Sequence, residues 1–443
     1  LGTLRIKAET IEAELAINKN KLIEKLLKIG KSTDEILKAG ENVDWQDLQS
    51  VTKFYRSFVK PTLPEILDEY RYINLLSSPK THIVNFTSNA LQVAGLAPAT
   101  KLFTGGIDAV SAAMTGKARQ AYAAEAGAYY KGSVNSINEA SKKALEVLRG
   151  AAKITRPDVA QIPTGAKLLK PFQIIPRALE ASDVFFRTIA EGGEKNSLAF
   201  RYAKQGKELT ETAKALINEE AKNKAAYSIF RMPNDPENLT GQGYLLSVVD
   251  NFTQKIVKPL RRDFKVRDRT IWNPAKLLLP FVETPMNIFK QGIEYSPAGV
   301  ATLPGAANKQ EQLAKALIGS TVALGAYGLA VNGNTTWKAP ANDKDRQIFY
   351  DSGRKPYSVK IGDKWVGYSR LGPIAYPIAL ATAVNWYLTE NPKAATEANE
   401  KRLMNVLSGI GGYFADQSYV EGLNNILQVL SGDVRGTAQL IGN

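Results

Sequence analysis

Hydrophobic residues recur at three- and four-residue spacing along most of the chain, which is the pattern of amphipathic helices. The first such run covers residues 1–29, and a second covers about 45–75, where Pro61 and Pro64 are expected to break or kink the helix. The same spacing predicts further helices at 178–204, 208–225, 244–262, 394–411 and 419–431. A loop rich in Pro, Asn and Gly separates the helices predicted at 208–225 and 244–262.

Two uncharged runs in the last third carry the strongest apolar signal. Residues 316–331 and 371–388 contain no charged side chain, and the second run has Trp386 and Tyr387 near its end, which suits a membrane–water interface. Both are slightly short for a standard membrane span of about twenty residues. They fit either core helices of a large bundle or helices that enter lipid only in one state. The candidate lipid-facing residues are Leu317, Val322, Leu324, Leu329, Ile378, Leu380, Trp386 and Tyr387.

Residues 81–100 also lack a formal charge if His82 is neutral, but their asparagine, glutamine and histidine side chains make them a poor membrane span. The following segment, 105–131, is rich in glycine and alanine, including Gly105 and Gly106. Small residues allow helices to approach closely. We expect a tightly packed bundle here rather than a membrane element.

One segment has the pattern of a β-hairpin. Residues 357–361 alternate in polarity, Gly362 and Asp363 supply a two-residue turn, and 364–368 form the returning strand. The expected fold class is therefore mainly α, an extended multi-helix assembly with one short hairpin near 357–368. We expect four regions: 1–78 amphipathic and helical, 79–170 apolar and Gly/Ala-rich, 171–280 helical with a basic end, and 281–443 with the apolar helices and the hairpin.

The charge balance favours polyanionic partners. The chain has 57 Lys and Arg against 43 Asp and Glu, a net charge of +14, and 44% of its residues are hydrophobic. Such a surplus favours DNA, RNA or anionic lipid as a partner, and the hydrophobic content is enough for a sizeable core. The densest basic cluster contains the candidate DNA-facing residues Lys258, Arg261, Arg262, Lys265, Arg267 and Arg269. Asp263 and Asp268 interrupt it, so a solvated helix end is the simpler interpretation and phosphate binding the second.

Enzyme chemistry has little support in the sequence. There is no cysteine and one histidine, His82, so thiol nucleophiles, thiolate zinc sites and two-histidine sites are excluded. A structural role for His82 is favoured over a catalytic one, and no phosphate-binding loop or calcium loop is present. We expect no enzyme activity, no cofactor and no metal. A pair of carboxylates brought together by the fold stays open, because linear sequence does not reveal it.

Four segments, in order along the chain, resemble parts of the large internal virion proteins of bacteriophages, which are ejected into the host with the genome. They are Leu75–Asn89 with its spaced asparagines, Ala178–Ile189 followed by 199–203, Leu279–Lys290 with 295–297, and Pro356–Leu371 followed by Gly372 and Pro373. The family often has an acidic residue where Gly372 stands, and a more basic stretch where Glu191 is followed by two glycines. None of these segments is a catalytic motif.

The resemblance implies a structural protein of the virion, packed near the portal, that passes into the host envelope at ejection and helps to form a conduit for DNA. Its partners would be further copies of itself, the portal or other virion proteins, phage DNA and the host membrane. The chain begins at Leu1, and we expect it to be one piece of a longer or processed polypeptide. The alternatives are a scaffold or plug that never enters lipid, a peptidoglycan-cleaving segment, and a nucleic-acid-binding module.

Overall fold

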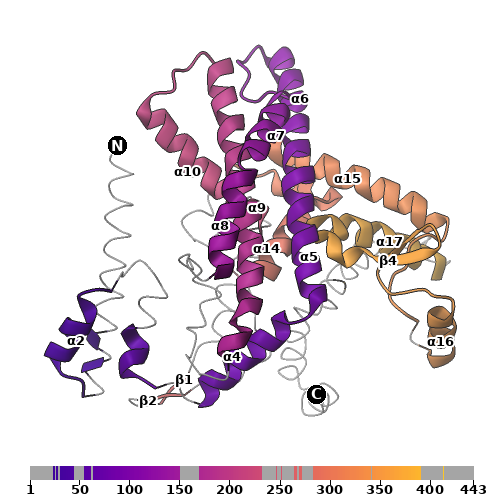
Figure 1. The fold of residues 1–443 in the computed structure, drawn as a ribbon. Helices are drawn as coiled ribbons and strands as arrows, with labels where there is room; N and C mark the ends of the chain where they lie inside the picture. The colour runs from indigo at the N-terminus through magenta and orange to yellow at the C-terminus, as the bar shows by residue number, and fades with distance from the viewer. Residues whose placement is uncertain are drawn as a thin grey trace. The chain divides into compact units, whose positions relative to one another are not determined.

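The computed structural model describes residues 23–24, 26–27, 30–43, 54–60, 63–149, 169–231, 246, 251, 264–266, 269–271, 283–340, 342–390 and 413. These residues are mainly α-helical, and the described strands form two separate two-stranded antiparallel sheets (Figure 1). The chain divides into two compact units, one made of 1–81 with 141–182 and the other of 82–140 with 183–443. The mainly α fold class expected from the sequence is confirmed.

The first unit contains α2 (Thr33–Gly40), α4 (Leu63–Leu76) and a short 3₁₀ turn, η2 (Lys170–Gln173). The Ser32 hydroxyl caps α2 by accepting the Glu35 backbone N–H at 3.2 Å, which satisfies one of the free donors at the helix start. Leu26, Ile36 and Phe54 form a small buried cluster. Gln173 also donates a hydrogen bond to Glu69 of α4.

The second unit is built around one long helical rod. It consists of α5 (Pro79–Ala90), a π-helical turn η1 (Leu91–Leu96) and α6 (Ala97–Thr115), so the uncharged segment 81–100 lies within it. The rod ends at Gly116, whose φ of +68° is a left-handed conformation that glycine adopts without strain. The helices that follow along the chain are α7 (Glu125–Asn135), α8 (Ile137–Arg149), α9 (Ile174–Lys204) and α10 (Glu211–Ser228), of which most of α8 and the start of α9 belong to the first unit.

Glycines set the distance between these helices. A Cβ atom on Gly105 of α6 would lie 2.0 Å from the Ala123 backbone nitrogen, and one on Gly132 of α7 would lie 2.3 Å from the carbonyl oxygen of Gly192 in α9. Any side chain would therefore force the backbones apart. Gly105 approaches the turn before α7 rather than a second helix, and a Cβ on Gly106 would have no neighbour within 4 Å.

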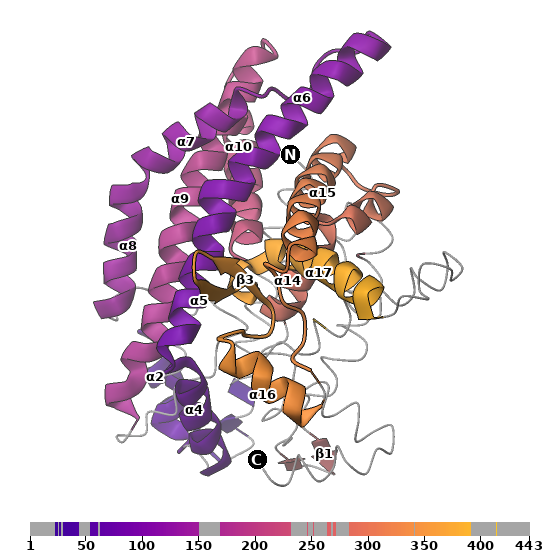
Figure 2. The same ribbon diagram turned by 90° about the vertical axis from the view of Figure 1, so that its right-hand side faces the viewer.

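The C-terminal part of the unit packs α14 (Glu283–Glu294), η5 (Pro297–Thr302), α15 (Lys309–Val331) and α17 (Ala375–Glu390) against one another, and α15 also packs against α6. Figures 1 and 2 show α15 and α17 side by side. Ala323, Ala326 and Ala381 form the seam between them, and Gly319 lies directly on the backbone of Tyr295. The helices predicted at 316–331 and 371–388 are thus present, although the second begins as a 3₁₀ turn, η6 (Tyr368–Ile374).

The predicted hairpin is confirmed. Strands β3 (Ser358–Ile361) and β4 (Lys364–Gly367) pair with Ile361 opposite Lys364, and Gly362 has a φ of +58° in the two-residue turn. The hairpin is preceded by α16 (Asp343–Asp351). A second antiparallel pair, β1 (Phe264–Val266) and β2 (Arg269–Ile271), was not predicted.

Other sequence predictions have mixed outcomes. The helices predicted at 178–204 and 208–225 correspond to α9 and α10, while α14 and α16 were not predicted. The first amphipathic run, 1–29, lies mostly outside the described residues, as do 244–262, 394–411 and 419–431. The four sequence regions and the two compact units divide the chain at different residues, so the regional scheme stays a prediction.

Candidate functional site

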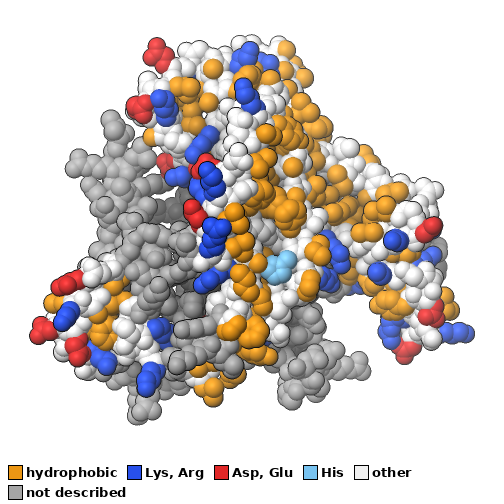
Figure 3. All heavy atoms as spheres, viewed as in Figure 1, with side chains coloured by type: hydrophobic (Ala, Val, Ile, Leu, Met, Phe, Trp, Pro, Cys, Tyr) orange, Lys and Arg blue, Asp and Glu red, His pale blue; other side chains and the backbone are white. Residues whose placement is uncertain are grey.

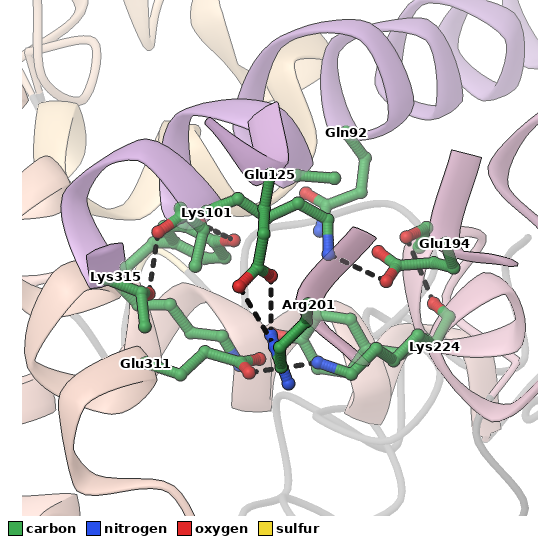
Figure 4. Close-up of a pocket in the computed structure, with 14 residues that line it drawn as sticks. Gln92, Lys101, Glu125, Glu194, Arg201, Lys224, Glu311 and Lys315 are labelled. Carbon is green, nitrogen blue, oxygen red and sulfur yellow. Dashed lines mark hydrogen bonds and ion pairs between the residues drawn. The ribbon is translucent and has the colours of Figure 1, made fainter. Parts of the chain in front are cut away.

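A network of buried and half-buried ion pairs joins helices of the second unit, and each of its four pairs connects two different helices. Two pairs link α6, α7 and α9, and the other two link α10, α14 and α15. The pairs are Lys101 of α6 with Glu194 of α9, Arg201 of α9 with Glu125 of α7, Lys224 of α10 with Glu311 of α15, and Lys315 of α15 with Glu294 of α14. Figure 4 shows these side chains, apart from Glu294, around one pocket.

The most deeply buried pair is that of Lys101 and Glu194. Their side chains are 7% and 4% exposed, and Nζ lies 2.7 Å from the carboxylate oxygen. The Arg201 guanidinium donates to both oxygens of Glu125, at 2.9 and 2.7 Å, which is the bidentate geometry that arginine favours. Each cation offsets the cost of burying its carboxylate, because an isolated buried charge is strongly unfavourable.

The pair of Lys315 and Glu294 has an aromatic neighbour. Lys315 donates to Glu294 at 3.1 Å and lies 4.3 Å from the centroid of the Tyr227 ring, a cation–π distance. The Tyr227 hydroxyl donates to the other Glu294 oxygen at 2.5 Å. Glu294 is therefore satisfied from two sides, which fits a position that is 7% exposed.

The mutual attraction of these groups outweighs their desolvation. The Lys224 ammonium holds the pKa of Glu311 well below its usual range, although burial acts in the opposite direction. Burial alone would lower the pKa of Lys224, yet the carboxylates of Glu311, Glu194 and Glu220 raise it above its usual value. Burial raises the pKa of Tyr227, and the Glu294 charge adds to that shift. At neutral pH Lys224 and Glu311 are thus both ionised, beside a neutral Tyr227 phenol.

Two cavities border the network and share Lys224, Tyr227, Glu311 and Lys315 in their linings. The smaller, of about 40 Å³, has Gln92 in its wall and holds at most a few waters. The larger, of about 300 Å³, lies among α10, α14 and α15, with Glu220 and Asn308 exposed at its rim. Buried Gln291 and Gln312 line the larger cavity.

A separate buried node brings together residues of the four segments that were singled out in the sequence. Asp183, from the second segment, accepts hydrogen bonds from Asn85 and Asn89 of the first segment, at 3.1 and 2.9 Å, and pairs with Arg231. From the third segment, the Asn287 side chain donates to the carbonyl of Phe230 at 3.0 Å. All of these residues belong to the second unit.

The fourth segment lies beside the first segment and Phe230. The Ser88 hydroxyl donates to the carbonyl of Arg370 at 3.0 Å, and Gly372, with a φ of +57°, lies against Ser88 and the Phe230 ring. A Cβ on Gly372 would be 3.3 Å from Ser88, so the turn leaves little room for a side chain. The four segments singled out in the sequence are therefore neighbours in the fold.

Helices α6 and α15 have an inverted polarity. The charged residues of α6, Lys101 and Asp108, are buried, whereas its exposed side carries Leu102, Phe103, Val110 and Met114. In α15 the buried side includes Lys315 of the ion-pair network, while the exposed side carries Leu317, Leu324, Tyr327, Leu329 and Val331. Because α6 and α15 pack together, these exposed apolar side chains form the apolar α6–α15 face, visible in Figure 3. Patches of this kind mark interaction surfaces in soluble proteins.

The sequence-predicted lipid-facing residues divide between the two apolar helices. On α15, Leu324 is 74% exposed and Leu317 and Leu329 are exposed to a lesser degree, while Val322 is half-buried. On α17, Ile378, Leu380 and Tyr387 are half-buried, and Trp386 is exposed near the helix end. By length and composition, α15 is the helix among the described residues that could cross a membrane, a test that a core helix also passes.

The predicted DNA-facing residues lie mostly outside the described part of the chain. This holds for Lys258, Arg261, Arg262 and Arg267, whereas Lys265 and Arg269 are placed in the backbone of β1 and β2. Within the described residues, no group of three or more His, Asp or Glu side chains is arranged to hold a metal ion. His82 lies half-buried on α5.

No protein-family model matches this chain, and neither a curated protein nor a solved structure matches it. Its function is therefore inferred from the geometry of the chain's own residues.

Proposed function

We propose that this chain is a structural protein of a bacteriophage particle that leaves the capsid with the genome and helps to form a conduit through the host envelope. In the virion it would assemble near the portal with further copies of itself. Its mechanism is assembly and insertion into lipid, with no bond chemistry. The virion and the host envelope are accordingly its two proposed locations, and phage DNA its proposed cargo.

The observation that carries this proposal is the inverted polarity of α6 and α15. Ionisable residues within membrane helices face the bundle interior, where they pair with one another, and apolar residues face lipid. Lys101 and Lys315 follow that arrangement, while Met114 and Leu324 are 82% and 74% exposed. A water-soluble helix would have the opposite pattern, with its charges in solvent.

Three further features support the same proposal. The net charge of +14 favours contact with DNA and anionic lipid headgroups. The absence of cysteine leaves no disulfide to lock the chain during passage. Residues of the four segments that resemble phage virion proteins are, moreover, neighbours in the fold: Asn85 and Asn89 bond to Asp183, Ser88 to Arg370, and Asn287 to Phe230.

The test is vesicle binding and leakage with the full chain. Vesicles of phosphatidylethanolamine and phosphatidylglycerol carry a self-quenched dye, and the wild type is compared with a Met114→Glu, Leu324→Glu variant. Both positions are exposed, so the variant should fold normally. The matched control is Leu37→Glu, because Leu37 is 59% exposed on α2 and lies outside the α6–α15 face.

We expect the wild type and the control to bind and release dye, and the double variant to lose at least tenfold in activity. A wild type that neither binds vesicles nor releases dye would overturn the proposal and favour a scaffold or plug that never enters lipid. Peptidoglycan turnover by the same preparation would instead favour the enzyme alternative. Protection of 313–331 from protease by vesicles would identify α15 as an inserted segment.

A further inference from the structure

The β3–β4 hairpin carries positive charge that the protein itself does not neutralise. Between Ser352 and Leu371 the chain has five basic residues and one acidic residue, Asp363. All five basic side chains are exposed, and none lies within ion-pair distance of a carboxylate of the described residues. These hairpin cations are Arg354, Lys355, Lys360, Lys364 and Arg370. Unpaired charge of one sign gathered in one place favours a partner of the opposite sign.

The pairing of the two strands places apolar side chains among the hairpin cations. Lys360 lies opposite Trp365, and directly opposite residues of an antiparallel pair have their side chains on the same face. The Arg354 guanidinium lies 6.0 Å from the centroid of the Trp365 ring. On the other face, Lys364 lies opposite Ile361, which is 62% exposed. Both faces of the hairpin therefore combine positive charge with apolar surface.

Backbone hydrogen bonds hold the hairpin at the C-terminal end of α15. That helix ends at Val331, and just beyond it the Asn334 carbonyl accepts the Lys360 backbone N–H at 2.8 Å. The Thr336 N–H donates to the Ser358 carbonyl, also at 2.8 Å. Figure 1 shows β4 beside this end of the helix. The hairpin cations thus lie where the exposed apolar side of α15 ends.

The exposed apolar side chains decide between two kinds of polyanion. A nucleic acid would use the cations and the Trp365 ring, but it would gain little from contact with Ile361 or with Val366, which is 42% exposed. A phospholipid bilayer uses both kinds of group, because acyl chains take up apolar side chains while Lys and Arg lie near anionic headgroups. Tryptophan is also enriched at the level of the headgroups. The combination of groups on the hairpin therefore favours lipid.

We propose that the β3–β4 hairpin binds the anionic headgroups of the membrane leaflet that α15 enters. This contact rests on the proposed function, since it depends on the apolar side of α15 meeting lipid. Each cation near an anionic surface adds to the affinity, and added salt weakens the contribution by screening the charge. The hairpin thus determines which lipids the chain prefers, whereas the α6–α15 face determines insertion.

The experiment measures co-sedimentation of the full chain with two kinds of vesicle, one of phosphatidylcholine alone and one of equal parts phosphatidylcholine and phosphatidylglycerol. The key variant is Lys360→Gln, Lys364→Gln, in which both side chains are exposed and outside any ion pair of the described residues, so the fold should be retained. The matched control is Lys131→Gln, Lys222→Gln, which removes the same charge from exposed positions on α7 and α10.

We expect the wild type and the control to prefer the phosphatidylglycerol vesicles, and the hairpin variant to bind them about thirtyfold more weakly, as loss of two cations near an anionic surface implies. Equal binding of the hairpin variant and the control would overturn the headgroup contact and leave the proposed function standing. A hairpin variant that lost affinity only for a DNA oligonucleotide would overturn it in favour of a nucleic-acid surface. If the proposed function failed instead, the wild type would neither bind vesicles nor release dye, and the headgroup contact would fail with it.

Discussion

Replacement of Lys101 by methionine would leave the Glu194 carboxylate buried beside α6 without its cation. The pair has an N–O distance of 2.7 Å and side chains 7% and 4% exposed, so water does not replace the lost ammonium. Removing one partner of such a pair costs about 3–5 kcal/mol. With a urea m-value of about 3 kcal/mol/M, the unfolding midpoint would fall by about 1–1.7 M.

The control for this prediction lies one residue from Glu194. Lys195 pairs with Glu191 at the same N–O distance of 2.7 Å, but its side chain is 42% exposed and that of Glu191 is 21% exposed. An exposed helical pair contributes about 0.3–0.5 kcal/mol, so Lys195→Met should hardly move the midpoint. Far-UV circular dichroism during equilibrium urea unfolding measures both variants. If Lys101→Met cost no more than Lys195→Met, burial would not determine the cost and this reasoning would be refuted.

A double variant separates the charge from the packing. In Lys101→Met, Glu194→Leu no unpaired charge remains, and apolar replacement of a whole buried pair is often close to neutral. We therefore expect most of the lost stability to return. If the two substitutions simply added, Lys101 and Glu194 would not be energetically coupled.

Three further predictions concern the same unit. Gly319→Ala should destabilise the unit by about 1–3 kcal/mol, because the new Cβ would lie 2.1 Å from the Tyr295 backbone. Gly325 lies on the same helix with open space around it, so Gly325→Ala should stabilise the unit slightly, and the two variants should shift the melting temperature in opposite directions. Asp183→Asn should cost about 2–4 kcal/mol, since the bond from Arg231 loses its charged acceptor, and an unchanged melting temperature would contradict the proposed node. The folded-state pKa of Glu311 is lowered, chiefly by Lys224, so the stability that this carboxylate contributes is present above the unfolded pKa of about 4.3 and is lost as the pH falls below that value toward the folded pKa. Glu311→Gln should therefore flatten the loss of stability in acid, measured by urea midpoints from pH 6 to pH 3.

Local patterns predicted the helices and the hairpin well, because they depend on near neighbours in the sequence. The alternation around Gly362 specified β3 and β4, and the uncharged run at 316–331 specified most of α15. The boundary of 371–388 was harder to predict. The turn at Gly372 depends on contacts with Ser88 and Phe230, which are distant in sequence.

The ion-pair network was not foreseen, since each of its pairs joins residues at least 21 positions apart. One signal could have indicated part of it. Lys101 and Asp108 are the charged residues in the otherwise uncharged segment 97–115, and charges so isolated in an apolar helix generally need a partner from elsewhere. The apolar face of α6 could be recognised only after these charges were located inside.

The π-helical turn between α5 and α6 sets the angular phase of the rod. Its wider turn absorbs one extra residue, so winding the same residues as an ordinary α-helix would rotate everything beyond them by roughly 100° about the helix axis. Ser88 and Asn89 would keep their contacts, while Lys101 would swing away from Glu194 and the apolar side of α6 would turn inward. A single inserted residue thus determines which side of the rod meets its surroundings.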